Sequence, residues 1–238
     1  MKNSVLHKAE TRGEARHGWL LSRHTFSFAN YYDPERIHFG ALRVINDDIV
    51  DAGMGFGTHP HDNMEIISIP LEGDLEHKDS MGNVAVIKHG DVQVMSAGTG
   101  IFHSEYNKNR DQKVKFLQIW VFPNKKQVKP RYDQITLNVA DRHNKLQQIL
   151  SPNSDDEGVW IHQNAWFHMG NFEKGVTAEY QMMAPGNGVY AFILNGDATI
   201  NGESLSARDG YGILDVEGVS IMADSDLEIL LMEVPMKW

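Results

Sequence analysis

Leu71-Glu72-Gly73-Asp74 returns 123 residues later in the chain as Leu194-Asn195-Gly196-Asp197. Each copy is followed by a short β-rich run, a glycine-centred turn, a second β-rich run and another turn, which contains Gly90-Asp91 in the first copy and Asp209-Gly210 in the second. Gly beside Asp or Asn after an apolar run is a turn signal. Because the same signals follow in the same order, the sequence predicts a duplicated β-barrel.

Short runs rich in β-branched and aromatic residues fill most of the chain, and helical periodicity is almost absent. Their spacing of about 8–12 residues is typical of an all-β barrel or sandwich. We expect residues 1–130 to form one barrel, and 131–238 to form a connection and a second barrel. Asn138–Leu150 is the best candidate for a short helix in the connection. The expected strands are Phe39–Ile45, Glu65–Leu71, Val84–Lys88, Val92–Met95, Val114–Phe122, Val189–Leu194 and Glu228–Val234.

Composition excludes several classes of protein. The 238 residues include 22 Lys and Arg against 32 Asp and Glu, and this negative surface would repel nucleic acid. The absence of Cys excludes disulfides, iron–sulfur clusters and thiol nucleophiles, so a transition-metal site must use the 12 His and the carboxylates. No run approaches the about 18 apolar residues of a membrane span, and Met1–Lys8 lacks the apolar core of a secretory signal. We expect a cytoplasmic protein without membrane contact.

Two short segments concentrate the residues that bind metals. Gly57-Thr58-His59-Pro60-His61 places two histidines at i and i+2, and Gly100-Ile101-Phe102-His103-Ser104-Glu105 places a His and a Glu at the same spacing. Residues at i and i+2 of a strand share one face. On neighbouring barrel strands, His59, His61, His103 and Glu105 would therefore converge inside the barrel. Three nitrogens and one oxygen suit Fe(II), and also Mn, Ni or Cu, with coordination positions left open.

Other interpretations of these segments are weaker. Ser104 is adjacent to His103, but neighbouring residues of a strand point to opposite faces, and the surrounding sequence lacks a nucleophile elbow. The run Gly53–Gly57 does not have the spacing of a dinucleotide-binding loop, and no helix follows it. We therefore expect neither a serine nucleophile nor a nicotinamide or flavin cofactor.

At these residues the chain resembles the cupin superfamily. Its first motif is matched by Gly53, His59, His61, Glu65 and Gly73, and its second motif more loosely by Gly90, Gly98, His103 and Asn107, with Ser96 where Pro is usual. The departures resemble the pirin branch of the cupins, in particular bacterial pirin-like proteins. The stretches that carry this resemblance are His24–Ala29, Tyr31–Pro34, Leu42–Asp48, Gly57–His61 and Met95–Gly100.

The resemblance implies a bicupin, two jelly-roll barrels with one metal in the N-terminal barrel. It implies His59, His61, His103 and Glu105 as the ligands, Fe(II) as the expected metal, and Mn, Ni, Cu or Zn as alternatives. Glu65 is then expected to orient a ligand histidine, and the alternative is a solvated strand residue.

The repeat predicts that the second barrel is structural. An offset of 123 residues maps His59, His61 and Glu65 to Met182, Ala184 and Gly188, none of which is a comparable ligand. His162 and His168 lie elsewhere, at a spacing that does not form a chelating pair. We therefore expect no metal in the C-terminal barrel.

The resemblance to pirin-like proteins implies quercetin 2,3-dioxygenase activity. In this reaction O₂ opens the flavonol ring and carbon monoxide is released. In that hypothesis the metal acidifies the flavonol 3-hydroxyl and Glu105 accepts its proton. Met54, Phe56, Met64 and Phe102 are candidate pocket walls, or else plain core. Two alternatives remain: a redox-sensitive regulator that binds protein partners, and a dioxygenase acting on another enolic metabolite.

Overall fold

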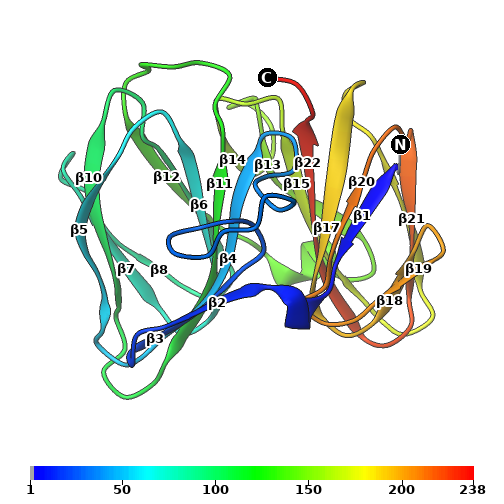
Figure 1. Ribbon diagram of the computed structural model, residues 1–238, viewed down its shortest axis with the longest axis horizontal. Coiled ribbons are helices and arrows are strands. Elements are labelled where there is room, and N and C mark those ends of the chain that lie inside the picture. Colours follow the sequence, from blue (N-terminus) through cyan, green and yellow to red (C-terminus); the bar gives the residue numbers. More distant parts are fainter. Residues whose placement is uncertain (1–2) are drawn as a thin grey trace.

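The computed structural model describes residues 3–238 and consists of two β-barrels side by side. Figure 1 shows the N-terminal barrel on the left, in blue to green, and the C-terminal barrel on the right, mostly in yellow to red but with one dark-blue strand from the start of the chain. Each barrel is closed by one seven-stranded and one four-stranded sheet. The two seven-stranded sheets face each other in the middle of the molecule. The expected all-β bicupin fold is confirmed.

The N-terminal barrel carries the two histidine-containing segments. In spatial order its seven-stranded sheet comprises β12 (Arg131–Thr136), β9 (Asp91–Ser96), β6 (Glu65–Glu72), β11 (Val114–Val121), β4 (Leu42–Val50), β3 (Leu20–His24) and β2 (Gly13–Arg16). Its four-stranded sheet comprises β5 (Gly55–His61), β10 (Ile101–Asn107), β7 (Leu75–Asp79) and β8 (Val84–Ile87).

The C-terminal barrel repeats this division. Its seven-stranded sheet comprises β1 (Ser4–His7), β20 (Gly210–Ile213), β17 (Asn187–Asn195), β22 (Leu227–Pro235), β15 (Trp166–Phe172), β13 (Leu146–Ser151) and β14 (Val159–Trp160). Its four-stranded sheet comprises β16 (Thr177–Gln181), β21 (Gly218–Ala223), β18 (Ala198–Ile200) and β19 (Glu203–Leu205).

The repeated turns occupy equivalent places in the two barrels. Gly73 follows β6 and Gly196 follows β17, and each turn leads from the seven-stranded into the four-stranded sheet. Both glycines have left-handed backbones, with φ of +76° and +83°. A Cβ at Gly196 would also lie 2.1 Å from the carbonyl oxygen of Asp226. The turns therefore require glycine for conformational and steric reasons.

Two strands depart from the expected division at residue 130. β1 pairs with β20 in the C-terminal barrel, and β12 pairs with β9 in the N-terminal barrel. Each barrel thus contains one strand from the part of the sequence that was assigned to the other barrel. A strand of four residues such as Ser4–His7 is too short for its hydrophobic pattern to show which barrel it joins.

The short helix expected over Asn138–Leu150 is limited to one 3₁₀ turn, η2 (Val139–Arg142). Asn138 caps this turn by accepting a hydrogen bond from the N–H of Ala140. Asn144 then adopts a left-handed backbone, and the chain continues as β13, paired with β15. The other 3₁₀ turn is η1 (Ala9–Thr11), and within residues 3–238 no helix is long and apolar enough to cross a membrane.

The main apolar core lies between the barrels. It combines Leu117 and Ile119 of the N-terminal barrel with Phe167, Phe192 and other buried residues of the C-terminal one. The C-terminal barrel has its own apolar interior, built from residues such as Ile193. The interior of the N-terminal barrel instead combines two small apolar clusters with many buried polar side chains. Because buried polar groups are costly unless they are paired, this difference points to a site in the N-terminal barrel.

The shared core predicts that the barrels stabilise each other. Phe167 is fully buried between them, so Phe167→Ala should lower the free energy of unfolding by about 3–5 kcal/mol. Urea denaturation followed by tryptophan fluorescence measures this change. The matched control Phe102→Ala removes a phenylalanine that is 55% exposed and should cost less than about 0.5 kcal/mol. Equal losses in the two variants would contradict the shared core.

Asp209 ties the N-terminal segment to the C-terminal barrel. Its carboxylate accepts hydrogen bonds from Lys8 Nζ at 2.8 Å and from the backbone N–H groups of Ala9 and Ser206. Burial alone would raise its pKa, but these donors outweigh burial and hold the pKa below its ordinary value of 3.8. The ionised carboxylate therefore stabilises the folded state.

Asp209→Asn should lower the melting temperature at pH 7, because the charge-assisted hydrogen bonds are lost. A group with a lowered pKa stabilises the fold above its unfolded pKa, and this contribution disappears as the pH falls through the folded pKa. The difference in melting temperature between Asp209→Asn and the wild type should therefore become smaller below pH 4. Melting curves between pH 7 and pH 2.5 test this, with the exposed Asp156→Asn as control. A difference that stays constant with pH would refute the assignment.

Candidate metal centre

The site is set by the antiparallel pairing of β5 with β10. His103 lies opposite His59, and Ile101 lies opposite His61. A bulge after this pair shifts the register, so that Glu105 faces Phe56. The inward positions of β10 are buried and its outward positions are exposed or half-buried, which places His103 and Glu105 on the interior face as i,i+2 parity predicts.

Three histidines gather at this point. Ligand nitrogens of His59, His61 and His103 all lie within 4.8 Å of one another, and their ring centroids are 4.4–4.9 Å apart. Two nitrogens bound to one metal at about 2.0–2.1 Å are at most about 4.2 Å apart, so small ring movements suffice. Among residues 3–238, Nε2 of His61 and both ring nitrogens of His103 have no hydrogen-bond partner. The donor set therefore fits a transition metal.

The protonation of these rings also suits coordination. His59 Nδ1 lies 2.8 Å from the carbonyl oxygen of Gly57, which can accept its proton and leave Nε2 free as a ligand. Burial, and then the neighbouring histidines, lower the pKa of His103 to about 2, and burial lowers that of His61 to about 4. Both rings are thus neutral near pH 7, the form that binds metals.

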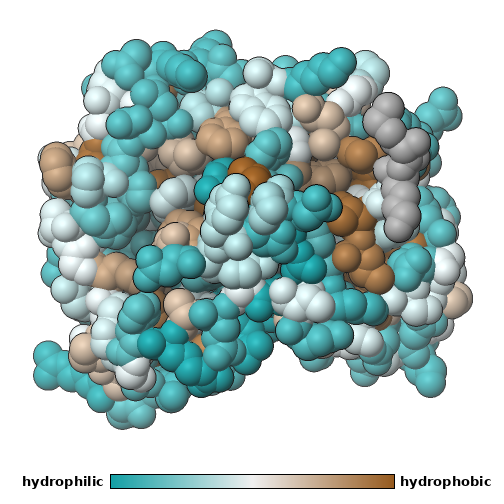
Figure 2. Space-filling model, in the orientation of Figure 1, coloured by the Kyte–Doolittle hydropathy of each residue, from teal (hydrophilic) through white to brown (hydrophobic). Residues whose placement is uncertain are grey.

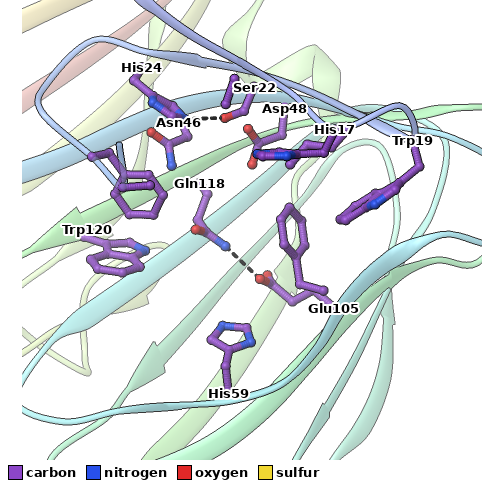
Figure 3. Close-up of a pocket in the computed structure, with 15 residues that line it drawn as sticks. His17, Trp19, Ser22, His24, Asn46, Asp48, His59, Glu105, Gln118 and Trp120 are labelled. Atoms are coloured by element: carbon purple, nitrogen blue, oxygen red, sulfur yellow. Dashed lines mark hydrogen bonds between the residues drawn. The ribbon is translucent and has the colours of Figure 1, made fainter. Parts of the chain in front are cut away.

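Glu105 lies beside this cluster but is held by other residues. Its carboxylate accepts hydrogen bonds from Ser68 Oγ at 3.2 Å and from Gln118 Nε2 at 2.7 Å. Burial raises its pKa to about 7. Its oxygens are not part of the close three-histidine group, so its expected role as fourth ligand stays a prediction. Figure 3 shows Glu105 and His59 on the same side of a cavity.

The expectation that Glu65 orients a ligand histidine is wrong. Its Oε2 accepts a 2.6 Å hydrogen bond from Ser96 Oγ, and the backbone of His162 provides another. Ile67, two residues further along the same face of β6, packs in the core between the barrels. Strand parity therefore turns Glu65 away from the histidines and toward the C-terminal half of the chain.

Sequence reasoning missed His77, which packs against His103. The two ring centroids are 5.3 Å apart, and His77 is almost fully buried. Its Nε2 lies 3.0 Å from Asp79 Oδ2, and Asp79 also accepts hydrogen bonds from the N–H groups of Met81 and Asn83. The i,i+2 spacing of His77 and Asp79 was a usable signal. This arrangement fixes the position of the ring behind His103.

A cavity of about 300 Å³ opens above the histidines, within the N-terminal barrel. Figure 3 shows its side chains arranged around a central space. Aromatic side chains form much of its wall, and polar ones occupy the face of β3, β4 and β11. The lining residues are Ala15, His17, Trp19, Leu20, Ser22, His24, Phe28, Ala29, Asn46, Asp48, Phe56, His59, Glu105, Gln118 and Trp120.

Of the four candidate wall residues, Phe56 lines this cavity. Phe102 is 55% exposed because it points out from β10, between inward neighbours, and Met54 is exposed as well. Met64 packs against a small apolar cluster instead. The expected wall positions of Met54, Met64 and Phe102 are therefore wrong.

Known proteins are similar to this chain along almost its whole length. The pirin family profile matches residues 5–121, and the profile of the quercetinase C-terminal cupin domain matches residues 148–234. Quercetin 2,3-dioxygenase of Escherichia coli strain K12 is 46% identical over 97% of this chain and 98% of its own length. The pirin-like protein of Caulobacter vibrioides is 39% identical over 93% of this chain and 95% of its own length.

Solved structures agree with this relationship. The bacterial pirin YhhW of E. coli, in complex with nickel(II), superposes with a TM-score of 0.92 at 45% identity and covers 98% of this chain and 99% of its own. A quercetin 2,3-dioxygenase of Acinetobacter baumannii has a TM-score of 0.81 at 20% identity, over 97% and 85% of the two chains, which shows the shared fold.

Two cupin barrels, with one cluster of three histidines among the described residues 3–238, define a bicupin with a candidate metal centre in its N-terminal barrel. Within that class, the match along almost the whole chain places this protein in the pirin family.

Removal of a clustered histidine should weaken metal binding. We expect His61→Ala and His103→Ala each to lower the affinity for a divalent transition metal at least about tenfold, because a nitrogen donor is lost. Metal content per chain after dialysis, measured by mass spectrometry, tests this. His89→Ala removes an exposed histidine of the same barrel and should retain the wild-type content. Wild-type content in the His103→Ala variant would contradict the site.

Proposed function

We propose that this protein is a metal-dependent dioxygenase that opens the flavonol ring of quercetin by 2,3-dioxygenation and releases carbon monoxide. Both oxygen atoms of O₂ enter the ring-opened product, so the reaction needs no external reductant. The observation that carries the proposal is a buried carboxylate, Glu105, beside a cluster of three histidines, at a cavity that Glu105 and His59 line together with four Trp and Phe side chains. The name and 46% identity of the E. coli relative support the same activity.

In this proposal His59, His61 and His103 hold the metal, and Glu105 is the fourth ligand or lies next to it. Fe(II) is the proposed metal, and Mn, Ni, Cu and Zn are alternatives that the same donors accept. The nickel(II) complex of the E. coli pirin supports one transition-metal ion. When bound, the metal would supply the Lewis acidity that lowers the pKa of the flavonol 3-hydroxyl.

Glu105 is placed to receive the proton of that hydroxyl. Ser68 and Gln118 donate to its two oxygens and so fix the orientation of the carboxylate. A carboxylate whose pKa lies near 7 is well matched to accept and later return a proton near neutral pH. Glu105 is therefore the proposed catalytic base.

Aromatic side chains hold the substrate rings and exclude water. Trp19 and Phe56 pack edge to face, with ring centroids 5.4 Å apart, and Phe28 and Trp120 do the same at 5.3 Å. All four line the cavity. A volume of about 300 Å³ is at the lower end of the range for small-molecule sites, about 300–1,000 Å³, and suits a planar ligand of two or three rings.

Carbon monoxide formation tests the proposal. Metal-loaded wild type incubated aerobically with quercetin should release carbon monoxide into the headspace in step with O₂ uptake, and metal-loaded His59→Ala should match the free-metal blank. The absence of carbon monoxide from every metal-loaded form of the wild type would contradict the quercetinase assignment. That result would favour the alternatives, a regulator that binds protein partners or a dioxygenase of another enolic metabolite.

The role of Glu105 is tested by an isosteric change. Glu105→Gln should retain much of the bound metal, because the three histidines remain, but should lower turnover at least about 100-fold, because the base is lost. Turnover is compared at matched metal occupancy. Equal turnover in this variant and the wild type would eliminate Glu105 as the base.

A further inference from the structure

A row of polar side chains crosses four strands of the N-terminal barrel. His24 of β3 pairs with Asn46 of β4, Asn46 with Gln118 of β11, and Gln118 with Ser68 of β6. Residues paired across strands share one face of a sheet, here the interior. Glu105 closes the row from the opposite sheet through its hydrogen bonds with Ser68 and Gln118. The row therefore extends from the candidate base to the far wall of the cavity.

A second row lies beside the first. Ser22 of β3 pairs with Asp48 of β4, and Ser22 Oγ lies 2.8 Å from His24 Nε2. Asp48 is 2% exposed, and burial raises the pKa of its carboxyl to about 7, although Ser22 favours the ionised form. Asn46 and Asp48 stand two residues apart on β4, so both side chains face the cavity that they line.

Two acceptor atoms of this wall are unsatisfied. Within the described part of the chain, residues 3–238, Oδ1 of Asn46 and Oδ1 of Asp48 have no hydrogen-bond partner. An unpaired buried acceptor is costly, and because Asn46 and Asp48 line the cavity, their partners are supplied by the water or ligand that the cavity holds. Oxygen acceptors are satisfied by donors, and the donor that an uncharged aromatic ligand offers is a hydroxyl group.

The fold itself does not demand these polar residues. In the C-terminal barrel, the strands of the seven-stranded sheet fill the interior with apolar side chains such as Ala191, Ile193, Ile229 and Leu231. A barrel of this fold can therefore be filled with apolar side chains. Asn46 and Asp48 are therefore best explained by what the cavity holds.

We propose that Asn46 and Asp48 form a hydrogen-bonding wall that selects substrates with hydroxyl groups remote from the one facing the histidines. The inference rests on the proposed function and specifies its substrate class as polyhydroxylated aromatic compounds. Aromatic residues hold the rings, Glu105 serves the reacting hydroxyl, and the β4 wall binds the remaining hydroxyls. An enol without such groups would leave both acceptors unpaired and would bind more weakly.

Binding to metal-free protein tests the wall separately from catalysis. The probes are quercetin and 3-hydroxyflavone, which has only the hydroxyl that faces the histidines, and the dissociation constants are measured by calorimetry at pH 7.5 without O₂. Wild type should bind quercetin at least about tenfold more tightly. Asp48→Ala should reduce this preference at least about threefold, with little change for 3-hydroxyflavone.

Asn46→Leu, which keeps the side-chain volume, should have the same effect and guards against misfolding of Asp48→Ala. Both are checked by circular dichroism and melting temperature. Asp51→Asn removes an exposed carboxylate just beyond the end of β4, 3.0 Å from Lys113, and should leave the preference unchanged. A wild type that binds the two probes equally, or a preference that survives in both wall variants, would overturn the inference.

The proposed function is tested independently by the turnover of 3-hydroxyflavone in metal-loaded wild type. This probe makes no use of the β4 wall, so its ring opening with release of carbon monoxide would support the dioxygenase whatever the binding preference. If neither 3-hydroxyflavone nor quercetin is opened, the proposed function fails. The binding measurements still show whether Asn46 and Asp48 select hydroxylated ligands.

Discussion

The bulged pairing of β5 with β10 is the constraint on which the site depends. It brings His103 opposite His59, and it lets Glu105 reach Ser68 and Gln118 on the other sheet. A regular ladder would place Gly57 opposite Glu105, whereas the bulge places Phe56 there and so puts an aromatic ring beside the carboxylate. One extra residue in β5 therefore couples the histidines to the aromatic cavity.

The two barrels divide the tasks of stability and chemistry. The core between them and the interior of the C-terminal barrel are apolar, and the N-terminal barrel carries buried His, Glu, Asp and Asn side chains. A polar interior contributes little to folding unless each group is paired. The large shared core offsets this weakness, and the exchange of β1 and β12 between the halves ties the barrels together.

In Figure 2 hydrophilic side chains cover the lower part of the furrow between the halves.

Much of the fold and of the centre could be predicted from the sequence, because both follow strong local rules. The repeated Gly-Asp turns require left-handed glycines, and i,i+2 spacing places His59 with His61 and His103 with Glu105. The expectation for Glu65 failed because β6 is buried on both faces from Glu65 to Pro70, so its pattern does not show which face meets the histidines.

The cavity wall was missed for a related reason. Asn46 and Asp48 in a strand resemble a solvent-facing edge, and only the pairing of β4 with β3 and β11 shows that they face inward. The strand expected at Phe39–Ile45 was accordingly misplaced, and in the structure it runs from Leu42 to Val50. Burial is inferred from the periodicity of apolar residues in a sequence. Buried polar residues are therefore the part of an interior that such patterns predict least well.

X-ray absorption spectroscopy of the metal-loaded protein shows directly whether the three histidines hold the metal. We expect one metal per chain, with scattering from three imidazole rings at about 2.0–2.2 Å, and weaker imidazole scattering in His59→Ala. A metal that shows no imidazole scattering, or whose spectrum is unchanged in His59→Ala, would contradict a centre built on β5 and β10.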